Sequence, residues 1–561
     1  MLGSYKDNRK QIFLVDYLYV MDKDEVQLDE RLDIHHYINS SNDYLKMGEK
    51  LGLLYLESIL EENKYSVTIY KVVNKKDEDC FIRLLKENNA KMVGFSLTYD
   101  NVTNINRFCD RLKRIYPDIH ITVGGPYVST VPEEYLLDNE QIDSVMCGEG
   151  EATILELVDR LINGKTLSGC KGIVYRSGVD IITEKPRSCI ENLDKLPFPK
   201  RNIEKPIHTR ICTSRGCIGS CSFCDVKKLW KKWRGRTPIN IVNEMEMLYK
   251  TLGITSFDFV DSSMEDPGAQ GKKRLYELAN ELKKRNIDVD WGGQIRAESF
   301  NMEDKELLSF LYDNGLERVF IGVESFSQHL LDIFHKRAKI EDNYRCIYFM
   351  RDEMKLAIDM GFIMFTPYTT IDDLILNIDG LNHTNMAWNS GYLASRLWLF
   401  HGTDIFHQIK ADGLLEQDYS YKNLFKYKFE VESMKELSIS LQELSRADIS
   451  VLSSEVIAMD KILVHMRRKY KYHEKIINKI ETQEKQLNEI KLVLTKNNVD
   501  FFSKCIELLG TQWNETYFQL LMKEYFNSDI FNKYIESVKN MSRILFMHIR
   551  RQGCKIDERW I

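Results

Sequence analysis

Hydrophobic and polar residues alternate along the first 186 positions in short blocks of two kinds. Apolar, β-branched runs typical of buried strands occur at 11–18, 66–73, 91–98, 120–125 and 144–151. Helical spacing of apolar residues occurs between them, at 51–63, 81–89, 104–117 and 152–163. Because strands and helices alternate, we predict a doubly wound, Rossmann-like parallel sheet over residues 1–186. Ligands of such sheets bind beyond the carboxyl ends of the strands.

A second series of strands and helices follows at 207–415. Strand candidates lie at 208–214, 256–262, 289–294, 318–324, 361–365 and 395–400, with helical stretches between them. Six strand–helix units are too few to close an eightfold barrel. We therefore predict an open, partial (β/α)6 barrel, with its chemistry at the carboxyl ends of the strands.

Proline marks two further boundaries. Residues 187–206 are rich in charge and contain Pro197, Pro199 and Pro206, which is typical of a linker. No proline follows Pro367, and proline is costly inside helices, so we predict a helical C-terminal domain at 416–561. Its segment 471–494 has helical spacing of apolar residues. We interpret it as an amphipathic helix packed on the core rather than a partner-binding coiled coil.

Composition narrows the class of protein. The 561 residues are 43% hydrophobic and 29% charged, which is ordinary for a globular protein. The net charge of −6 argues against a nonspecific binder of nucleic acid or anionic membranes. No apolar run approaches the ~20 residues that span a bilayer. The polar start leads into a strand rather than a signal peptide, so we expect a cytoplasmic protein with neither nucleic-acid nor membrane partners.

Three of the twelve cysteines form the most informative motif. Cys217, Cys221 and Cys224 stand in R-G-C-I-G-S-C-S-F-C-D at 215–225. Three thiolates on one short loop can bind three irons of a 4Fe–4S cluster and leave the fourth iron open for a small molecule. A structural zinc site is the alternative. It would need a fourth ligand, and the nearest candidates, Cys212 and His208, lie upstream within a predicted strand.

The C-x3-C-x2-C motif, with Phe223 before its last cysteine, resembles the radical S-adenosylmethionine (SAM) enzymes. Segments 259–266, 292–299, 317–337 and 399–406 resemble the second-, third-, fourth- and sixth-strand motifs of that family, so the resemblance covers about 200–410. It implies that the three cysteines hold the cluster and that the open iron binds SAM. A 5′-deoxyadenosyl radical would follow from reductive cleavage. The segment 361–378 departs from the family, since Thr366-Pro367-Tyr368-Thr369-Thr370 lacks the acid of a frequent Gly-x-Pro-x-Glu-Thr pattern.

The resemblance also implies a set of SAM-binding residues. Phe223 would lie near the adenine, and Asp261 and Ser262 near the methionine end. The ribose or carboxylate would be bound by Gln294, Arg296, Glu324 and Ser325. Asp261 could instead cap a helix, and Glu324 could be a structural ion-pair partner.

Residues 1–185 resemble the cobalamin-binding domain that is fused to one class of radical SAM enzymes. The resemblance implies that glycines let the backbone approach the corrin and that polar side chains bond its amides or nucleotide tail. These candidates are Ser96, Thr98, Gly124, Gly125, Tyr127, Gly148 and Glu149. The cobalt-ligating Asp-x-His-x-x-Gly motif is missing, because Ile38 replaces the glycine after Asp33-Ile34-His35 and His120 begins a strand. We therefore expect cobalamin without a lower histidine ligand. A domain that keeps the fold but has lost the cofactor is the alternative.

These features predict a cobalamin-dependent radical SAM enzyme that methylates an unactivated carbon of a small molecule or natural-product intermediate. The alternatives are a radical SAM dehydratase, epimerase or cyclase with a vestigial cobalamin domain, and a non-catalytic cobalamin or redox sensor. A flavodoxin- or ferredoxin-type protein would supply the electron. Cys505 and Cys554 alone follow the barrel, too few for the auxiliary cluster of many peptide-modifying relatives.

Overall fold

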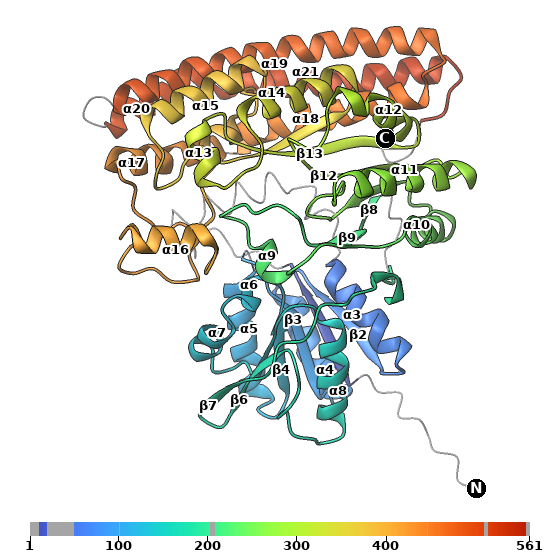
Figure 1. The fold of residues 1–561 in the computed structure, drawn as a ribbon, viewed down its shortest axis with the longest axis vertical. Coiled ribbons are helices and arrows are strands. Elements are labelled where there is room, and N and C mark those ends of the chain that lie inside the picture. The colour runs from blue at the N-terminus through green and yellow to red at the C-terminus, as the bar shows by residue number, and fades with distance from the viewer. Residues whose placement is uncertain are drawn as a thin grey trace. The chain divides into compact units, whose positions relative to one another are not determined.

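The protein is described here by a computed structural model. It describes residues 11–18, 50–99, 101–201, 208–445, 447–509 and 514–556. The chain divides into two compact units (Figure 1). The first unit contains the described residues up to 201 together with 225–236, and the second contains 208–224 and 237–556.

The first unit is built on a seven-stranded sheet in the order β2-β1-β3-β4-β5-β6-β7. Its five parallel strands are β1 (Ile12–Tyr17), β2 (Val67–Val72), β3 (Met92–Ser96), β4 (His120–Gly124) and β5 (Ser144–Met146). The main helices are α3 (Leu51–Glu62), α4 (Lys75–Glu87), α5 (Val102–Ile115) and α8 (Glu151–Ile162). All six residues of β1 are buried, as expected when helices cover both faces of a sheet. The predicted doubly wound sheet is confirmed.

An antiparallel hairpin extends this sheet beyond the sequence prediction. β6 (Ile173–Ser177) pairs antiparallel with β5, and β7 (Asp180–Thr183) pairs antiparallel with β6. The order 2-1-3-4-5 of the parallel strands places the topological switch point between β1 and β3. Cofactors of such sheets bind beside that point, at the carboxyl edge.

The second unit contains a five-stranded parallel sheet in the order β14-β13-β12-β11-β8. Its strands are β8 (His208–Ile211), β11 (Ser256–Phe259), β12 (Asp290–Arg296), β13 (Leu316–Glu324) and β14 (Ala357–Phe362). The connecting helices are α10 (Pro238–Leu252), α11 (Ala269–Lys284), α12 (Lys305–Asp313), α13 (Gln328–Ile333), α14 (Ile340–Tyr348) and α15 (Ile371–His383). The open, partial barrel is confirmed.

The sixth predicted strand, 395–400, is not a regular strand. A single parallel bridge joins Arg396 to Phe365, beyond the end of β14, and the Leu397 N–H donates to the Phe365 carbonyl at 2.8 Å. Pro367, two residues after Phe365, has no N–H to donate, and proline ends strand pairing for that reason. The sixth segment therefore lies beside the sheet without extending its ladder.

The two faces of this sheet differ. Residues such as Phe257, Trp291, Ile321 and Met360 are buried in the core shared with the helices. Their strand neighbours point to the opposite side, because side chains alternate along a strand. Those neighbours are more accessible: Phe320 is 38% exposed, and Val260, the residue that follows β11, is 40% exposed. We call this accessible side the inner face of the partial barrel.

The C-terminal residues form α16 (Asp404–Ala411), α17 (Glu432–Ser440), α18 (Ala447–Lys469), α19 (Glu474–Leu509), α20 (Glu515–Tyr525) and α21 (Ser528–Arg551). The helices α18, α19 and α21 run side by side (Figure 1), and α18 contacts β13 and β14. The apolar residues of 471–494 are buried on one face of α19, in the core that includes the barrel helices. The predicted amphipathic helix is confirmed, and the helical region shares one unit with the barrel.

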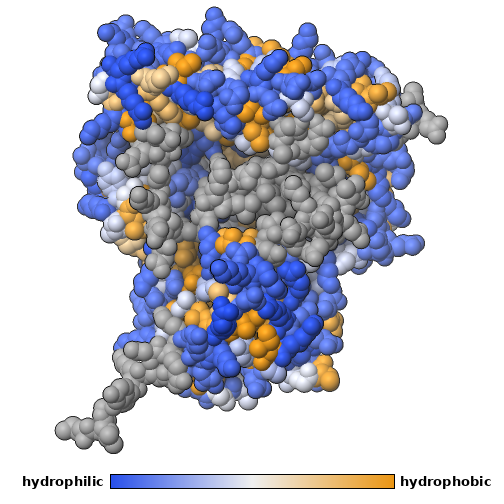
Figure 2. Space-filling view, turned by 180° about the vertical axis from the view of Figure 1, so that it is seen from behind, coloured by the Kyte–Doolittle hydropathy of each residue, from blue (hydrophilic) through white to orange (hydrophobic). Residues whose placement is uncertain are grey.

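The surface is mixed in character. The face shown in Figure 2 is mainly hydrophilic, with apolar residues in separate patches. In the described part of the chain, none of the helices combines the length and the apolar character needed to traverse a bilayer.

Candidate functional site: the cysteine loop and the strand ends

The three-cysteine loop follows β8 at the carboxyl edge of the barrel sheet. Two of its thiols converge on Gly219: a Cβ at that position would lie 3.2 Å from Sγ of Cys217 and 4.0 Å from Sγ of Cys221. Burial raises the pKa of both thiols. Without a bound cation the thiols therefore stay protonated, and a metal that binds the thiolates must displace those protons.

Ser222, between the second and third cysteines, anchors the loop to two other elements. Its N–H and hydroxyl donate to the carbonyls of Phe334 (2.9 Å) and Ile333 (2.7 Å), and its carbonyl accepts from the Ile405 N–H (2.9 Å). Phe223 packs edge-to-face on Phe334, with the ring centroids 5.3 Å apart. These contacts fix the backbone between the cysteines on α13 and α16.

Asp261 holds the start of the loop. Its carboxylate, fully buried, accepts from the N–H groups of Thr213 (2.7 Å) and Ser214 (2.9 Å) and from both of their hydroxyls. Arg274 lies 3.7 Å away as a counter-ion. Asp261 was predicted to lie near the methionine end of SAM or to cap a helix. Its carboxylate instead makes four contacts with Thr213 and Ser214 and is closed to solvent.

Asp266 joins the loop to Arg296. One carboxylate oxygen accepts from the Ile218 N–H at 2.9 Å, and the other forms an ion pair with the Arg296 guanidinium. Arg296 also pairs with Glu298 (2.9 Å), and its Nη1 lies 4.0 Å from Sγ of Cys217. Arg296, predicted to bind the ribose or carboxylate of SAM, thus lies beside Cys217, and its two acidic partners hold the orientation of its guanidinium.

Glu324 ends β13 in a conformation that is rare for a residue with a side chain. Its φ is 65°, in the left-handed region. Its carboxylate lies 3.4 Å from Nζ of Lys336, and a Cβ at Gly361 would lie 3.0 Å from that carboxylate. The glycine gives Glu324 the room to fold back over the inner face. Strained backbone of this kind is concentrated at functional sites.

The remaining SAM candidates differ in accessibility. Ser325 is fully buried and donates to Oδ1 of Asn377 at 2.8 Å, so its hydroxyl supports the turn after β13. Gln294 is exposed on the inner face, and Ser262 is half-buried after β11. Gln294, Arg296 and Glu324 therefore share the carboxyl part of the inner face, whereas Ser325 lies behind it.

The donor set fits an iron–sulfur cluster better than a single zinc ion. Sulfurs that share one tetrahedral zinc lie about 3.8 Å apart. The sulfur atoms of the three cysteines do not all lie within 4.8 Å of one another. Among the described residues, the ligand atoms of Asp290, Glu317 and His465 do lie that close together. Three cysteines on one glycine-containing loop suit a larger group with one ligand position left open.

Three buried charged groups at this edge were not among the predicted site residues. They are Glu265, Asp266 and Lys336, which contact Arg296, the cysteine loop and Glu324. All three lie inside the motifs at 259–266 and 317–337. The motifs therefore indicated the right segments of the chain. Which residues of these segments contact one another depends on the fold.

In the first unit the predicted cobalamin residues follow β3, β4 and β5 and so share the carboxyl edge. Lys50 Nζ lies 3.5 Å from the Ser96 carbonyl and 3.4 Å from the Thr98 hydroxyl. Gly125 has φ 113°, and a Cβ there would lie 2.7 Å from the Leu97 carbonyl, so no other residue fits. Gly148 has φ 74° with open space beside it, and Tyr127 packs edge-to-face on Tyr99. Because glycines have no side chain, the backbone at this edge of the sheet can closely approach a large, flat cofactor.

Glu149 and His120 are committed to other contacts. The Glu149 carboxylate pairs with Arg234 at 2.9 Å and accepts from the Ile190 N–H at 2.5 Å. His120 starts β4, at the end of the strand opposite the glycines, and contacts the Ser144 hydroxyl at 2.8 Å. It is the one histidine among the described residues of this unit. The position of Asp33 and His35 lies outside the described residues.

Comparisons with known proteins agree with this geometry. Residues 44–158 match the model of the B12 binding domain, and residues 211–377 match that of the Radical SAM superfamily. This chain is a radical SAM enzyme with a B12-binding domain. This radical SAM enzyme is similar to "Uncharacterized methyltransferase PH0819" of Pyrococcus horikoshii. The two sequences are 28% identical over 63% of this chain and 78% of that protein. The "Anaerobic magnesium-protoporphyrin IX monomethyl ester cyclase" of Rubrivivax gelatinosus is also 28% identical, over 57% of this chain and 59% of that protein.

The fold of this radical SAM enzyme is also that of solved structures. The cobalamin-dependent enzyme OxsB, with aqua-cobalamin and SAM bound, aligns with a TM-score of 0.66 at 15% identity, over 99% of this chain and 82% of OxsB. The methyltransferase TsrM of Kitasatospora setae aligns with a TM-score of 0.54 at 16% identity, over 67% and 70%. The enzyme uses a 4Fe–4S cluster, SAM and cobalamin, the cofactors of its two domains.

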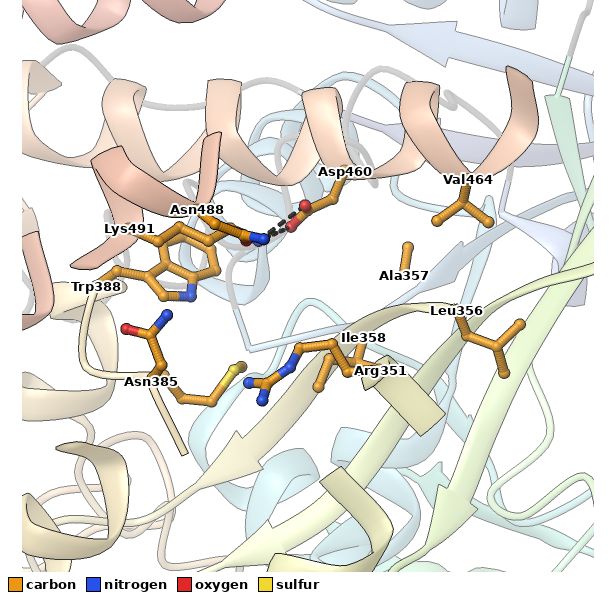
Figure 3. A pocket seen from close by; sticks show the side chains of 11 residues that line it. Arg351, Leu356, Ala357, Ile358, Asn385, Trp388, Asp460, Val464, Asn488 and Lys491 are labelled. Atoms are coloured by element: carbon orange, nitrogen blue, oxygen red, sulfur yellow. Dashed lines mark hydrogen bonds and ion pairs between the residues drawn. The ribbon is translucent and has the colours of Figure 1, made fainter. Parts of the chain in front are cut away.

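The opposite end of the barrel sheet has polar groups of a different kind. Glu317 accepts from His465 (3.0 Å) and Arg468 (2.6 Å), both on α18, and Asp290 pairs with Arg318. Near the start of β14 a cavity of about 60 Å³ is lined by Arg351, Ala357, Trp388, Asp460 and Lys491 among others (Figure 3). The Asp460–Lys491 ion pair crosses its wall at 2.6 Å. The cavity lies at the amino end of its strand, away from the cysteine loop.

Proposed function

We propose that this enzyme methylates a carbon atom of a small-molecule substrate. One observation carries the proposal: the same chain contains two candidate cofactor sites. The first is the glycine-rich carboxyl edge of the B12-binding domain, and the second is the three-cysteine loop whose backbone is held by Asp261 and Asp266. A relative named as a methyltransferase supports it. When bound, the cluster supplies an electron for reductive cleavage of SAM, and cobalamin supplies methyl transfer.

The protein's own residues position and shield these groups. Cys217, Cys221 and Cys224 hold the cluster, and Asp261 and Asp266 hold the backbone on which those cysteines stand. Arg296 and Glu324 bind the polar groups of SAM, with Gln294 beside them on the inner face and Phe223 near the adenine. Ser96, Thr98, Gly124, Gly125, Tyr127 and Gly148 form the cobalamin edge. A flavodoxin- or ferredoxin-type protein delivers the electron.

Product analysis tests the proposal. The purified, reduced enzyme with cobalamin and SAM is expected to form both S-adenosylhomocysteine and 5′-deoxyadenosine in the presence of substrate. The first product reports the methyl group given up by SAM, and the second reports reductive cleavage. Formation of 5′-deoxyadenosine alone, with full corrinoid occupancy and a consumed substrate, contradicts methyl transfer.

A ring-forming reaction is the second candidate. Three of the relatives are named as anaerobic cyclases, from three organisms, at 27–28% identity. In that case the mass of the product lacks the 14 Da that a methyl group in place of hydrogen adds, and no S-adenosylhomocysteine accompanies turnover. One mass spectrum of the product separates the two candidates.

A further inference from the structure

Asp359, in the middle of β14, is a carboxylate of the inner face with no assigned role. In the parallel ladder it is the register partner of Phe320, which is the partner of Gln294. Register partners point to the same side of a sheet, so the three side chains form one layer of the inner face. This layer lies two residues, or ~7 Å, below the layer of Arg296, Gly322 and Gly361.

Only one oxygen of this carboxylate is engaged within the described residues. Oδ1 accepts from the Tyr392 hydroxyl at 2.6 Å and from the Met360 N–H at 2.8 Å. Both donors are neutral. The other carboxylates of the inner face have cations: Asp258 pairs with Arg318 at 3.0 Å, and Glu324 lies 3.4 Å from Lys336. Asp359 differs from them because no cation of the described chain pairs with it.

Phe320 provides the second half of the site. Phe320 is 38% exposed although it lies in the middle of the longest strand of the sheet. Its edge approaches Gly361, since a Cβ there would lie 3.3 Å from Cε1 of Phe320. An accessible aromatic residue in the same layer as an uncompensated carboxylate attracts cations, through the ring quadrupole and through direct ion pairing. A partly buried carboxylate without a counter-ion is costly, and a bound cation removes that cost.

We propose that Asp359 and Phe320 bind the protonated amine of the substrate. The inference deepens the proposed function and rests on it for describing the ligand as a substrate. The substrate class is then a small molecule with an ammonium group, held one layer below Arg296 and Glu324. Gln294, the register partner of Phe320, supplies a neutral wall beside that ring.

Binding of simple probes tests this without turnover. Benzylammonium and benzyl alcohol have similar shapes and differ in charge, so we would titrate each into the full-length protein and measure its Kd by ligand-observed NMR. The protein is expected to prefer the ammonium by about tenfold or more, which is typical of a charge-assisted contact. The preference is expected to disappear in Asp359→Asn and to weaken in Phe320→Leu.

Asp412→Asn is the matched control. Asp412 also accepts from a tyrosine hydroxyl, that of Tyr368 at 2.7 Å, but it lies at the end of α16. This variant is expected to keep the preference. Equal binding of the two probes to the unaltered protein overturns the proposal, even if Asp359→Asn fails to fold. So does a preference that survives in a folded Asp359→Asn variant. The readout needs no SAM, cluster or cobalamin, so it is separate from a failure of methyl transfer.

Discussion

The two ends of the barrel sheet both bury several carboxylates, but they use them differently. At the carboxyl end, Asp261 and Asp266 accept from backbone N–H groups of the cysteine loop. At the amino end, Asp290 and Glu317 accept from the side chains of Arg318, His465 and Arg468. Buried carboxylates therefore shape a loop at one end, and at the other end the carboxylate of Glu317 fastens α18 to the sheet. Function is expected to depend on the first arrangement and stability on the second.

Removal of a cluster ligand is the largest expected effect. Cys221→Ala leaves two thiolates for a cluster that needs three, so we expect iron to fall from about four per chain to background and SAM cleavage to stop. Iron analysis and the yield of 5′-deoxyadenosine measure this. Cys80→Ala, on α4 of the first unit, is the control and is expected to keep both values.

Paired substitutions at the two ends test the comparison itself. Asp266→Asn removes a charge that orients Ile218 and Arg296, so we expect cluster affinity to fall roughly 10–100-fold, the usual effect of a residue that supports metal ligands. Glu317→Gln leaves the Arg468 guanidinium without its carboxylate, so we expect the free energy of unfolding to fall by about 3 kcal/mol with iron content unchanged. Denaturant titration and iron analysis of both variants provide the measurements. If Glu317→Gln loses iron as readily as Asp266→Asn does, the two ends do not have separate roles.

The two ends are also expected to respond to pH in opposite directions. Burial raises the pKa of the Glu265 carboxyl, against the opposing charge of Arg296. Its contribution to stability is therefore present at low pH and is lost as the pH rises through its folded-state pKa. At the other end burial opposes ionisation of Asp258, but Arg318 and His208 prevail and lower its pKa. That contribution is lost as the pH falls.

Glu265→Gln isolates the first effect. The amide stays neutral at every pH, so we expect the variant to gain a few degrees in Tm over the unaltered protein at pH 8 and less at pH 5. Calorimetry at the two pH values measures the difference. The same gain at both pH values would show that shape, rather than charge, is responsible.

The smallest expected effect concerns the room beside Glu324. Gly361→Ala places a methyl group 3.0 Å from the Glu324 carboxylate, which must then move, so we expect a loss of about 1 kcal/mol in stability. SAM binding is expected to weaken as well. Gly52→Ala, in the first turn of α3, is the control, because a Cβ there meets nothing within 4 Å and alanine has the higher helix propensity, so a small gain in stability is expected. Thermal unfolding of both variants measures the change in stability, which is expected to be a loss for Gly361→Ala and not for Gly52→Ala.

The fold was predictable from the sequence wherever periodicity alone decides an element. The buried strands of the first unit and the apolar face of α19 are repeated patterns, so their assignment needed no tertiary information. The hairpin of β6 and β7 and the loss of the sixth strand were not predictable in this way. The first is attached through pairing with β5, and the second depends on how Pro367 ends the ladder beside it.

The site was predictable in its cysteines and less so in its acidic residues. The spacing of Cys217, Cys221 and Cys224 by itself predicts a cluster-binding loop. By contrast, Asp261 and Asp266 belong to one short motif and look alike in sequence. Which of them contacts Arg296 is determined by the turn after β11. Asp359 has no sequence signal, since its lack of a counter-ion is a property of the folded inner face.

The long C-terminal helices have a practical consequence for shortened versions of the protein. The 36 residues of α19 span about 54 Å, and α18 and α21 lie along it. One side of α21 buries Phe531, Ile535, Val538, Met541 and Leu545. A chain that stops before residue 528 would leave the facing apolar row of α18 and α19 exposed to water. Such fragments are expected to aggregate or to be degraded during expression, although every residue of the cysteine loop is still present.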